Sequence, residues 1–304
     1  MDKKENREKE NKEIAVFSVS NKIIILFLIS QLIALFVGIF LITNYQFFKE
    51  LAVTEDPSKP EYPFYLISVI LLGAVFLILI LKLPIREIVI RIIEFFASVF
   101  ASFIVFFVFF ASFSVPYADV ISIFVSLALY GLKFYFWRIN NLLAIVSAVG
   151  VGSIIGFSLD PFPVIVLLFL VSVYDIIAVW FTKHMVEFAE FFSKRRTVFT
   201  ISEVGIGEVE KIVKGKKKIE KKVISMMLGA GDIALPAALV VSSFKLGDII
   251  FPVFVIGGAV FGLYLVLKRA ERERKVYPAM PSISIFSIFS FLLIILIYYF
   301  MGWL

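Results

Sequence analysis

Apolar runs of about 20 residues recur along the whole chain, separated by short polar or charged stretches. A run of this length crosses the hydrocarbon core of a bilayer as a helix, and lipid offers backbone groups no partner outside their own helix. The pattern therefore predicts an all-α polytopic membrane protein with nine transmembrane helices. The predicted spans are about 23–43, 64–82, 95–114, 119–136, 141–158, 162–182, 223–243, 249–267 and 281–302.

The basic residues predict the orientation of these spans. All but three of the 30 Lys and Arg lie in alternate polar segments, and the other side of the membrane has only Lys49, Lys59 and Lys245. Cytoplasmic loops carry the excess of Lys and Arg, so we expect a multi-pass protein of the cell membrane with a cytoplasmic N-terminus and an external C-terminus. The predicted parts are a charged cytoplasmic N-terminal segment, 1–22, and a single membrane domain, 23–302, with a basic cytoplasmic loop at 183–222.

The composition narrows the chemistry. The chain has 304 residues, of which 61% are hydrophobic, and it contains no Cys and one His, His184. Disulfides and thiolate metal sites are excluded, and a histidine-based metal site or a Ser-His triad is disfavoured. We predict no metal and no cofactor. The net charge of +6 follows the membrane topology and suits contact with anionic lipid headgroups, so no nucleic-acid partner is predicted.

Two acids lie deep inside predicted spans, Asp175 in 170–180 and Asp232 in 226–240. A charge at the centre of a membrane helix costs about 2.5–3.5 kcal/mol on insertion scales, so such a residue marks a functional site. At about 1.5 Å per helical residue, Asp175 lies about 12 Å before Lys183 and Asp232 about 15 Å after Lys222. The two carboxylates are therefore predicted at nearly the same depth on consecutive antiparallel helices.

Two carboxylates that face each other in a partly dry site tend to share one proton. The ionised member can take a proton from water while the protonated member polarises a carbonyl, as in aspartic peptidases. Gly229 and Gly231 let another backbone approach Asp232. Pro236 lacks the N–H that would bond the carbonyl of residue 232, so the helix is loosened there.

The same acid pair leaves other hypotheses open. A proton- or ion-coupled transporter or a leak channel also uses intramembrane acids, and it predicts pH- or ion-dependent flux without proteolysis. A non-catalytic membrane binding protein, or a hydrogen-bonded helix pair with no chemistry, predicts function that survives loss of either carboxylate.

Three motifs stand in order along the chain: Tyr174-Asp175, Gly229-Ala230-Gly231-Asp232, and Pro278-Ala279-Met280. With the predicted spans, they resemble the YD, GxGD and PAL motifs of the GxGD intramembrane aspartyl proteases, presenilin and signal peptide peptidase. Met280 stands where the family usually has Leu, a volume-conserving change. A prepilin-type peptidase shares GxGD but has neither the PAL segment nor nine spans.

This resemblance implies a presenilin-like fold and an intramembrane aspartyl endopeptidase that hydrolyses peptide bonds within transmembrane segments, using an Asp-Asp pair and water. It implies that Asp175 and Asp232 are catalytic and that the PAL segment shapes the site and positions the substrate. The predicted site-shaping residues are Tyr174, Gly229, Gly231, Pro278, Ala279 and Met280.

The basic loops match the orientation of presenilin, so the substrates are expected to be transmembrane helices with their N-termini outside. The loop 183–222 is much shorter than the presenilin loop that is cut in maturation, which argues against internal processing. The chain is similar to the compact microbial (archaeal) presenilin homologues, which need no accessory subunits, and a homo-oligomer stays open. Residues 196–204 have strand-like composition; they pair with an unwound substrate or form a plain cytoplasmic loop.

Overall fold

The structure is a computed structural model that describes residues 2–54, 56–81, 85–181, 197–213, 216–273 and 277–302. It is mostly helical. The long helices are α1 (Asp2–Thr43), α3 (Tyr62–Leu81), α4 (Arg86–Ser112), α5 (Ala118–Leu132), α6 (Trp137–Ser158), α7 (Pro161–Ile176), α9 (Ala230–Ser243), α10 (Ile250–Glu273) and α11 (Met280–Met301). The short elements are α2 (Tyr45–Phe48), η1 (Lys49–Leu51), the π-helical η2 (Ile177–Phe181) and η3 (Phe244–Leu246), and two strands, β1 (Thr200–Val213) and β2 (Lys216–Gly229), complete the fold.

Six helices in the described part of the chain are long and apolar enough to cross a membrane. They lie at Val19–Thr43, Arg86–Ser112, Arg138–Ser158, Pro161–Val179, Ile250–Glu273 and Met280–Met301. Two shorter apolar helices, Tyr62–Leu77 and Ala118–Leu132, fall below that length. Helix α9 has 14 residues, or about 21 Å at 1.5 Å per residue, against a hydrocarbon core of about 30 Å.

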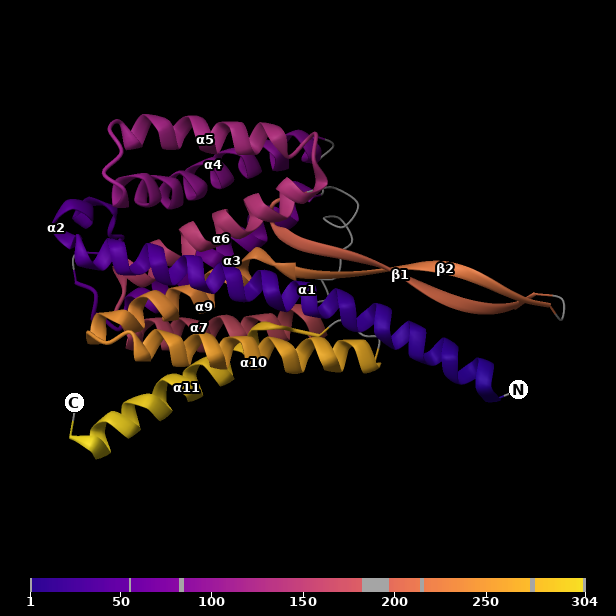
Figure 1. Cartoon of the computed structure of the whole chain (residues 1–304). Helices are drawn as coiled ribbons and strands as arrows, with labels where there is room; N and C mark the ends of the chain where they lie inside the picture. The colour runs from indigo at the N-terminus through magenta and orange to yellow at the C-terminus, as the bar shows by residue number, and fades with distance from the viewer. Residues whose placement is uncertain are drawn as a thin grey trace.

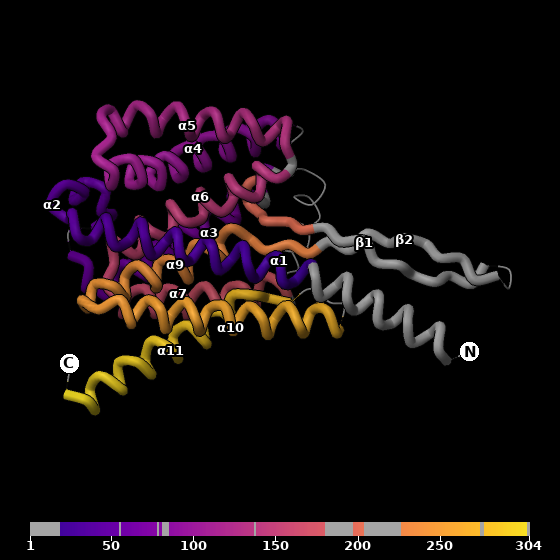
Figure 2. Tube along the Cα trace, in the orientation of Figure 1, coloured from indigo at the N-terminus to yellow at the C-terminus, as the bar shows by residue number. Residues whose placement is uncertain are grey.

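Helix α9 forms the centre of the bundle. Every residue from Ile233 to Ser243 is buried, and the helix contacts α1, α6, α7, α10 and α11. The α4–α5 hairpin packs on α6 on one side of this centre, and α10 and α11 pack on each other on the opposite side (Figure 1). Helix α1 runs through the bundle between these sides, in contact with α6, α9 and α10 (Figure 2).

Two glycines let α6 lie directly against the backbone of α9. A Cβ at Gly152 would come within 2.3 Å of the Ala234 carbonyl oxygen, and a Cβ at Gly156 within 2.4 Å of the Ala238 carbonyl oxygen. No side chain other than hydrogen fits at these positions, so α6 fixes the position of the first half of α9.

The β1–β2 hairpin corrects three predictions. Its antiparallel register runs from Thr200↔Gly229 to Val213↔Lys216, so residues 223–229 are strand and the predicted span 223–243 is helical only from Ala230. The loop 183–222 is likewise a hairpin over much of its length, although residues 182–196 and 214–215 lie outside the described residues. The fold is mostly helical rather than all-α. The helix prediction assumed that residues 223–229 meet lipid, whereas paired strands satisfy their own backbone groups.

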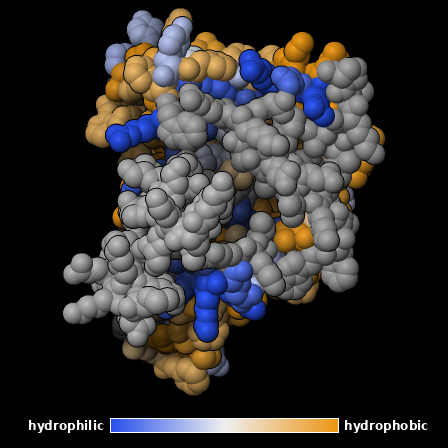
Figure 3. Space-filling model, turned by 90° about the vertical axis from the view of Figure 1, so that its right-hand side faces the viewer, coloured by the Kyte–Doolittle hydropathy of each residue, from blue (hydrophilic) through white to orange (hydrophobic). Residues whose placement is uncertain are grey.

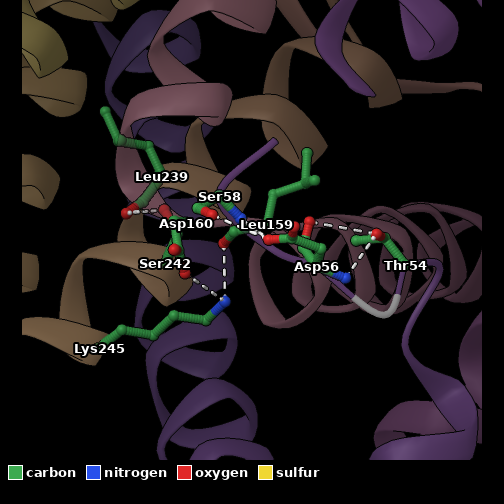
Figure 4. A network of polar contacts seen from close by, with 8 residues as sticks. All are labelled: Thr54, Asp56, Ser58, Leu159, Asp160, Leu239, Ser242 and Lys245. Atoms are coloured by element: carbon green, nitrogen blue, oxygen red, sulfur yellow. Dashed lines mark hydrogen bonds and ion pairs between the residues drawn. The ribbon is translucent and has the colours of Figure 1, made fainter. Parts of the chain in front are cut away.

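A polar network closes the end of the bundle opposite the hairpin (Figure 4). The Lys245 ammonium group donates to the Leu159 carbonyl oxygen at 2.9 Å and pairs with Asp160 at 3.2 Å. Burial lowers the pKa of Lys245, and the charge of Asp160 partly offsets this effect. The backbone N–H of Asp160 donates to Pro57. The network joins the segment after α2, the α6–α7 turn and the end of α9.

The other end of the bundle is more polar than its sides. Figure 3 looks onto the end where the hairpin leaves the bundle, and among the coloured residues hydrophilic side chains gather at this end. Hydrophobic side chains lie at the flanks of the same view. This distribution matches a bundle whose sides face lipid and whose end faces water.

Candidate active site

Asp175 lies at the point where helix α7 changes its hydrogen-bonding pattern. It is the second-to-last residue of α7, two residues before the start of the π-helical segment η2, and such segments are frequent at functional sites. Its Oδ2 atom accepts a hydrogen bond from the backbone N–H of Met280 at 3.3 Å. Tyr174, the preceding residue, is partly buried, as is Asp175.

Asp232 lies in the first turn of α9, not in the middle of a helix as the sequence predicted. Gly229 is the residue before the helix, and its backbone N–H donates to Asp232 Oδ2 at 3.3 Å. The carboxylate thereby satisfies one of the donors that a helix start leaves unpaired. Pro236 lies inside the helix and provides no N–H to the carbonyl of Asp232.

The structure places the two carboxylates within range of each other's charge. Asp175 is close enough to Asp232 to interact with it electrostatically, and both side chains are partly buried. The depth calculation that predicted this meeting was wrong in one step, because the residues from Lys222 to Gly229 are strand and rise about 3.3 Å each. Lys222 is therefore about 28 Å along the chain from Asp232 instead of about 15 Å, so this lysine does not mark the depth of the aspartate.

Each carboxylate also lies at the start of a helix. Asp232 belongs to the first turn of α9, and Asp175 faces the first residue of α11. Helix N-termini carry unpaired N–H groups and a partial positive charge that stabilise anions. The N-termini of α9 and α11 both lie at the acidic pair, so they can stabilise a negative charge on it although the site is partly buried.

The two glycines of the GxGD motif have different surroundings. A Cβ at Gly229 would lie 3.2 Å from Asp232 Oδ2, so a side chain there would push the carboxylate. A Cβ at Gly231 would meet no heavy atom of the described residues within 4 Å, and Gly231 is exposed. Among the described residues, the space beside Asp232 is therefore open on the side of Gly231.

The Pro278-Ala279-Met280 segment lies beside Asp175 and is irregular up to the start of α11. Pro278 and Met280 are buried, Ala279 is partly buried, and α11 begins at Met280. The segment contacts the acidic pair through a backbone N–H rather than through a side chain. Pro278 precedes the helix, and Pro281 lies in the first turn of α11, where proline is tolerated.

Gln31 of α1 also approaches the first turn of α9, although the sequence pattern did not single it out. Its side chain is fully buried, and Nε2 donates to the Ile233 carbonyl oxygen at 3.2 Å. An amide in the middle of an apolar span was the signal that could have identified it, because polar residues within membrane spans face partners.

Three comparisons with known proteins identify the relatives of this chain. The model of the family described as signal-peptide peptidase, presenilin aspartyl protease matches residues 24–299. No curated protein is similar enough to count as a match.

Two solved structures of a presenilin family intramembrane aspartate protease are similar to this fold. The one in a C222 crystal form has a TM-score of 0.64 and 23% sequence identity, covering 90% of this chain and 97% of that chain. The one in a P2 crystal form has a TM-score of 0.58 and 26% identity, covering 87% and 95%. These findings favour the peptidase hypothesis over the transporter or leak channel. The chain belongs to the signal-peptide peptidase and presenilin family of intramembrane aspartyl proteases, and it is a multi-pass membrane hydrolase.

Proposed function

We propose that Asp175 and Asp232 are the catalytic pair of this protease. The observation that carries the proposal is their geometry: two partly buried carboxylates from α7 and α9 interact, and each accepts a backbone N–H at a helix start. The open space beside Gly231 gives a peptide bond room to approach. Tyr174 and the Pro278-Ala279-Met280 segment shape the site around Asp175.

The reaction needs one ionised and one protonated carboxyl group. The ionised group takes a proton from water as the water oxygen bonds to the peptide carbonyl carbon, and the protonated group gives its proton to the carbonyl oxygen. The C–N bond of the resulting tetrahedral intermediate then breaks as the proton taken from water passes from the first carboxyl group to the amide nitrogen, and one hydroxyl of the intermediate returns its proton to the second carboxylate as the carbonyl re-forms. The new carboxyl and amino termini leave, and the pair again holds one proton.

We also propose nine membrane spans, with the N-terminus cytoplasmic and the C-terminus outside the cell membrane. The distribution of basic residues supports this orientation. The network around Lys245 supports the predicted alternation of the spans, because it gathers three segments that the prediction places on the same side of the membrane. If α9 ends at the outer boundary, its length of about 21 Å places Asp232 within the membrane, in its cytoplasmic half.

In this orientation the substrate is a transmembrane helix with its N-terminus outside, and part of it must unwind to expose a peptide bond. The hairpin offers backbone partners for an unwound segment. Antiparallel pairs alternate between those that exchange hydrogen bonds and those that face away from each other. The Ala230 N–H donates to the Phe199 carbonyl oxygen, so these two residues form a hydrogen-bonded pair. Counting three pairs along the register, the backbone N–H and C=O groups of Ser202 and Met227 point away from each other, toward the outer edges of the hairpin.

The two outer edges of the hairpin differ near the acidic pair. On β1, the Asn141 side chain bonds to the backbone C=O of Ser202 at 2.9 Å and to its N–H at 3.2 Å. This contact argues against substrate pairing on residues 196–204. We place the extended substrate on the outer edge of β2 at Met227, two residues before Gly229.

Cleavage of a labelled transmembrane substrate by the purified protein in proteoliposomes tests the catalytic pair. Asp175→Ala and Asp232→Ala are each expected to abolish cleavage while the protein stays folded, as judged by thermal unfolding. Wild-type activity in both variants would refute the proposal. Activity of the purified chain alone also tests the expectation that no accessory subunit is required.

A further inference from the structure

A buried ion pair joins helix α4 to the end of α5. Glu94 and Lys133 lie 2.8 Å apart, and each side chain is 3% exposed. The Lys133 ammonium group lies 4.2 Å from the centre of the Tyr130 ring. Burying two charges costs several kcal/mol per ion, and an apolar pair of similar volume is often as stable. Stability alone therefore does not explain why these charges are here.

The Glu94 carboxylate has a second partner outside the helical bundle. Its Oε1 atom accepts the backbone N–H of Val198 at 2.5 Å. Val198 is buried and precedes β1, and the carbonyl oxygen of the next residue, Phe199, accepts the N–H of Ala230 at 2.8 Å. Ala230 is the first residue of α9. A hydrogen bond to the Glu94 side chain and a backbone hydrogen bond at the next residue thus connect Glu94 to the turn that carries Asp232.

Two neighbouring side chains hold the same segment. Asn140 donates to the Thr197 carbonyl oxygen at 2.9 Å, and Asn141 pairs with both backbone groups of Ser202. Both asparagines belong to the first turn of α6. The two asparagines attach the segment from Thr197 to Ser202 to helix α6, and the Glu94 carboxylate attaches the same segment to helix α4.

We propose that Glu94 is a positioning residue for Asp232. Lys133 holds the Glu94 carboxylate in place, the carboxylate holds the base of β1 through Val198, and β1 sets the position at which α9 begins. The inference rests on the proposed catalytic role of Asp232. It assigns a function in the reaction to a charged group that touches neither the substrate nor the acidic pair.

Two neutral double variants isolate the hydrogen bond to Val198. E94Q/K133M removes both charges and keeps a side-chain oxygen that can accept the N–H, whereas E94L/K133M has similar volume and no acceptor. We expect kcat of E94L/K133M to be about 10- to 100-fold below that of E94Q/K133M, the range that a displacement of about 1 Å costs. KM is expected to agree within about twofold, because the substrate surface is unchanged.

Other variants separate this inference from general destabilisation. D160N/K245M removes a partly buried ion pair of 3.2 Å at the other end of the bundle and is expected to keep kcat within about twofold of wild type. If E94L/K133M does not fold, E94D serves instead. It keeps the charge but withdraws the acceptor by one methylene, and a kcat reduced with unchanged KM and melting temperature supports the inference.

Each outcome decides between the two proposals. Equal kcat values for E94Q/K133M and E94L/K133M, or wild-type kcat for E94D, would overturn the positioning role of Glu94. If the positioning role of Glu94 is overturned but Asp232→Ala abolishes cleavage, the catalytic assignment of Asp232 still stands. Persistent cleavage by Asp232→Ala would instead remove the catalytic assignment on which the inference rests.

Discussion

Substituting Gly152 by Ala tests whether helix α6 determines the position of the first turn of α9, which carries Asp232. The added Cβ would lie 2.3 Å from the Ala234 carbonyl oxygen and 2.9 Å from the Ala237 Cβ. Ordinary contacts begin at 3.4 Å, so the two helices must separate by about 1 Å. The nearest obstacle is backbone, which cannot move aside by rotating a side chain. Ala234 lies two residues after Asp232, so the displacement reaches the carboxylate.

Gly152→Ala is expected to lower both the stability and the activity of the protein. Overpacking a well-packed interface costs about 1–3 kcal/mol of unfolding free energy. A displacement of about 1 Å at a catalytic group lowers the rate about 100-fold. The assay is cleavage of a labelled transmembrane substrate in proteoliposomes, with kcat and KM measured separately and thermal unfolding measured on the same preparations.

Gly156→Ala is the matched control. Its Cβ would lie 2.4 Å from the Ala238 carbonyl oxygen, so the steric conflict is nearly equal but occurs one helical turn further from Asp232. We expect both variants to lose similar stability and Gly152→Ala to lose at least tenfold more kcat, within the range attributed to misplacement. Equal activity losses, or wild-type activity in Gly152→Ala, would refute the argument that close packing of α6 positions the turn.

Three further variants test single contacts. Gly229→Ala brings a Cβ to 3.2 Å from Asp232 Oδ2 and should reduce kcat roughly tenfold, measured against wild type; unchanged kcat contradicts this. Met280→Leu should change the unfolding free energy by less than about 1.5 kcal/mol and keep activity, because the hydrogen bond to Asp175 comes from the backbone N–H of residue 280. Loss of cleavage would contradict this. The hydrogen bond from Tyr298 lowers the pKa of Asp248, so its stabilisation is present above the unfolded-state pKa of about 3.9 and is lost as pH falls through the lower folded-state pKa. Asp248→Asn should therefore flatten the fall in melting temperature below about pH 4, and identical pH profiles contradict this.

The sequence carried enough information to locate most helices and both aspartates. Apolar runs near 20 residues predict helices because lipid leaves no other partner for the backbone. Lone carboxylates inside such runs are costly, which identified Asp175 and Asp232 before any motif was considered. These two arguments need only composition and length, so they do not depend on which helices contact each other.

The strand before α9 could not be predicted in the same way. Residues 223–229 are apolar and continue directly into the helix, and periodicity does not separate a buried strand from a helix in so short a run. The pairing partner of the strand begins at Thr200, and the sequence gives no direct sign of such distant pairing. The boundary at Gly229 is visible only as a residue that suits a helix start.

The contacts that hold the acidic pair were also beyond sequence reasoning. Met280 was predicted to help position the substrate, but in the structure its backbone N–H bonds to Asp175. The contact between Gln31 and Ile233 joins residues about 200 positions apart. Such contacts depend on which helices are neighbours, and this follows from packing throughout the bundle rather than from any local pattern.

The strand–helix junction gives the acid pair surroundings that suit the proposed catalysis. A continuous membrane helix would pair every backbone N–H near Asp232 within itself, and the carboxylate would meet only apolar side chains. Because α9 starts at Ala230 and α11 at Met280, two helix starts supply unpaired N–H groups and favourable dipoles at one place. The break in regular helix therefore provides, in one feature, the donors that hold the carboxylates and the open backbone beside which a substrate can unwind.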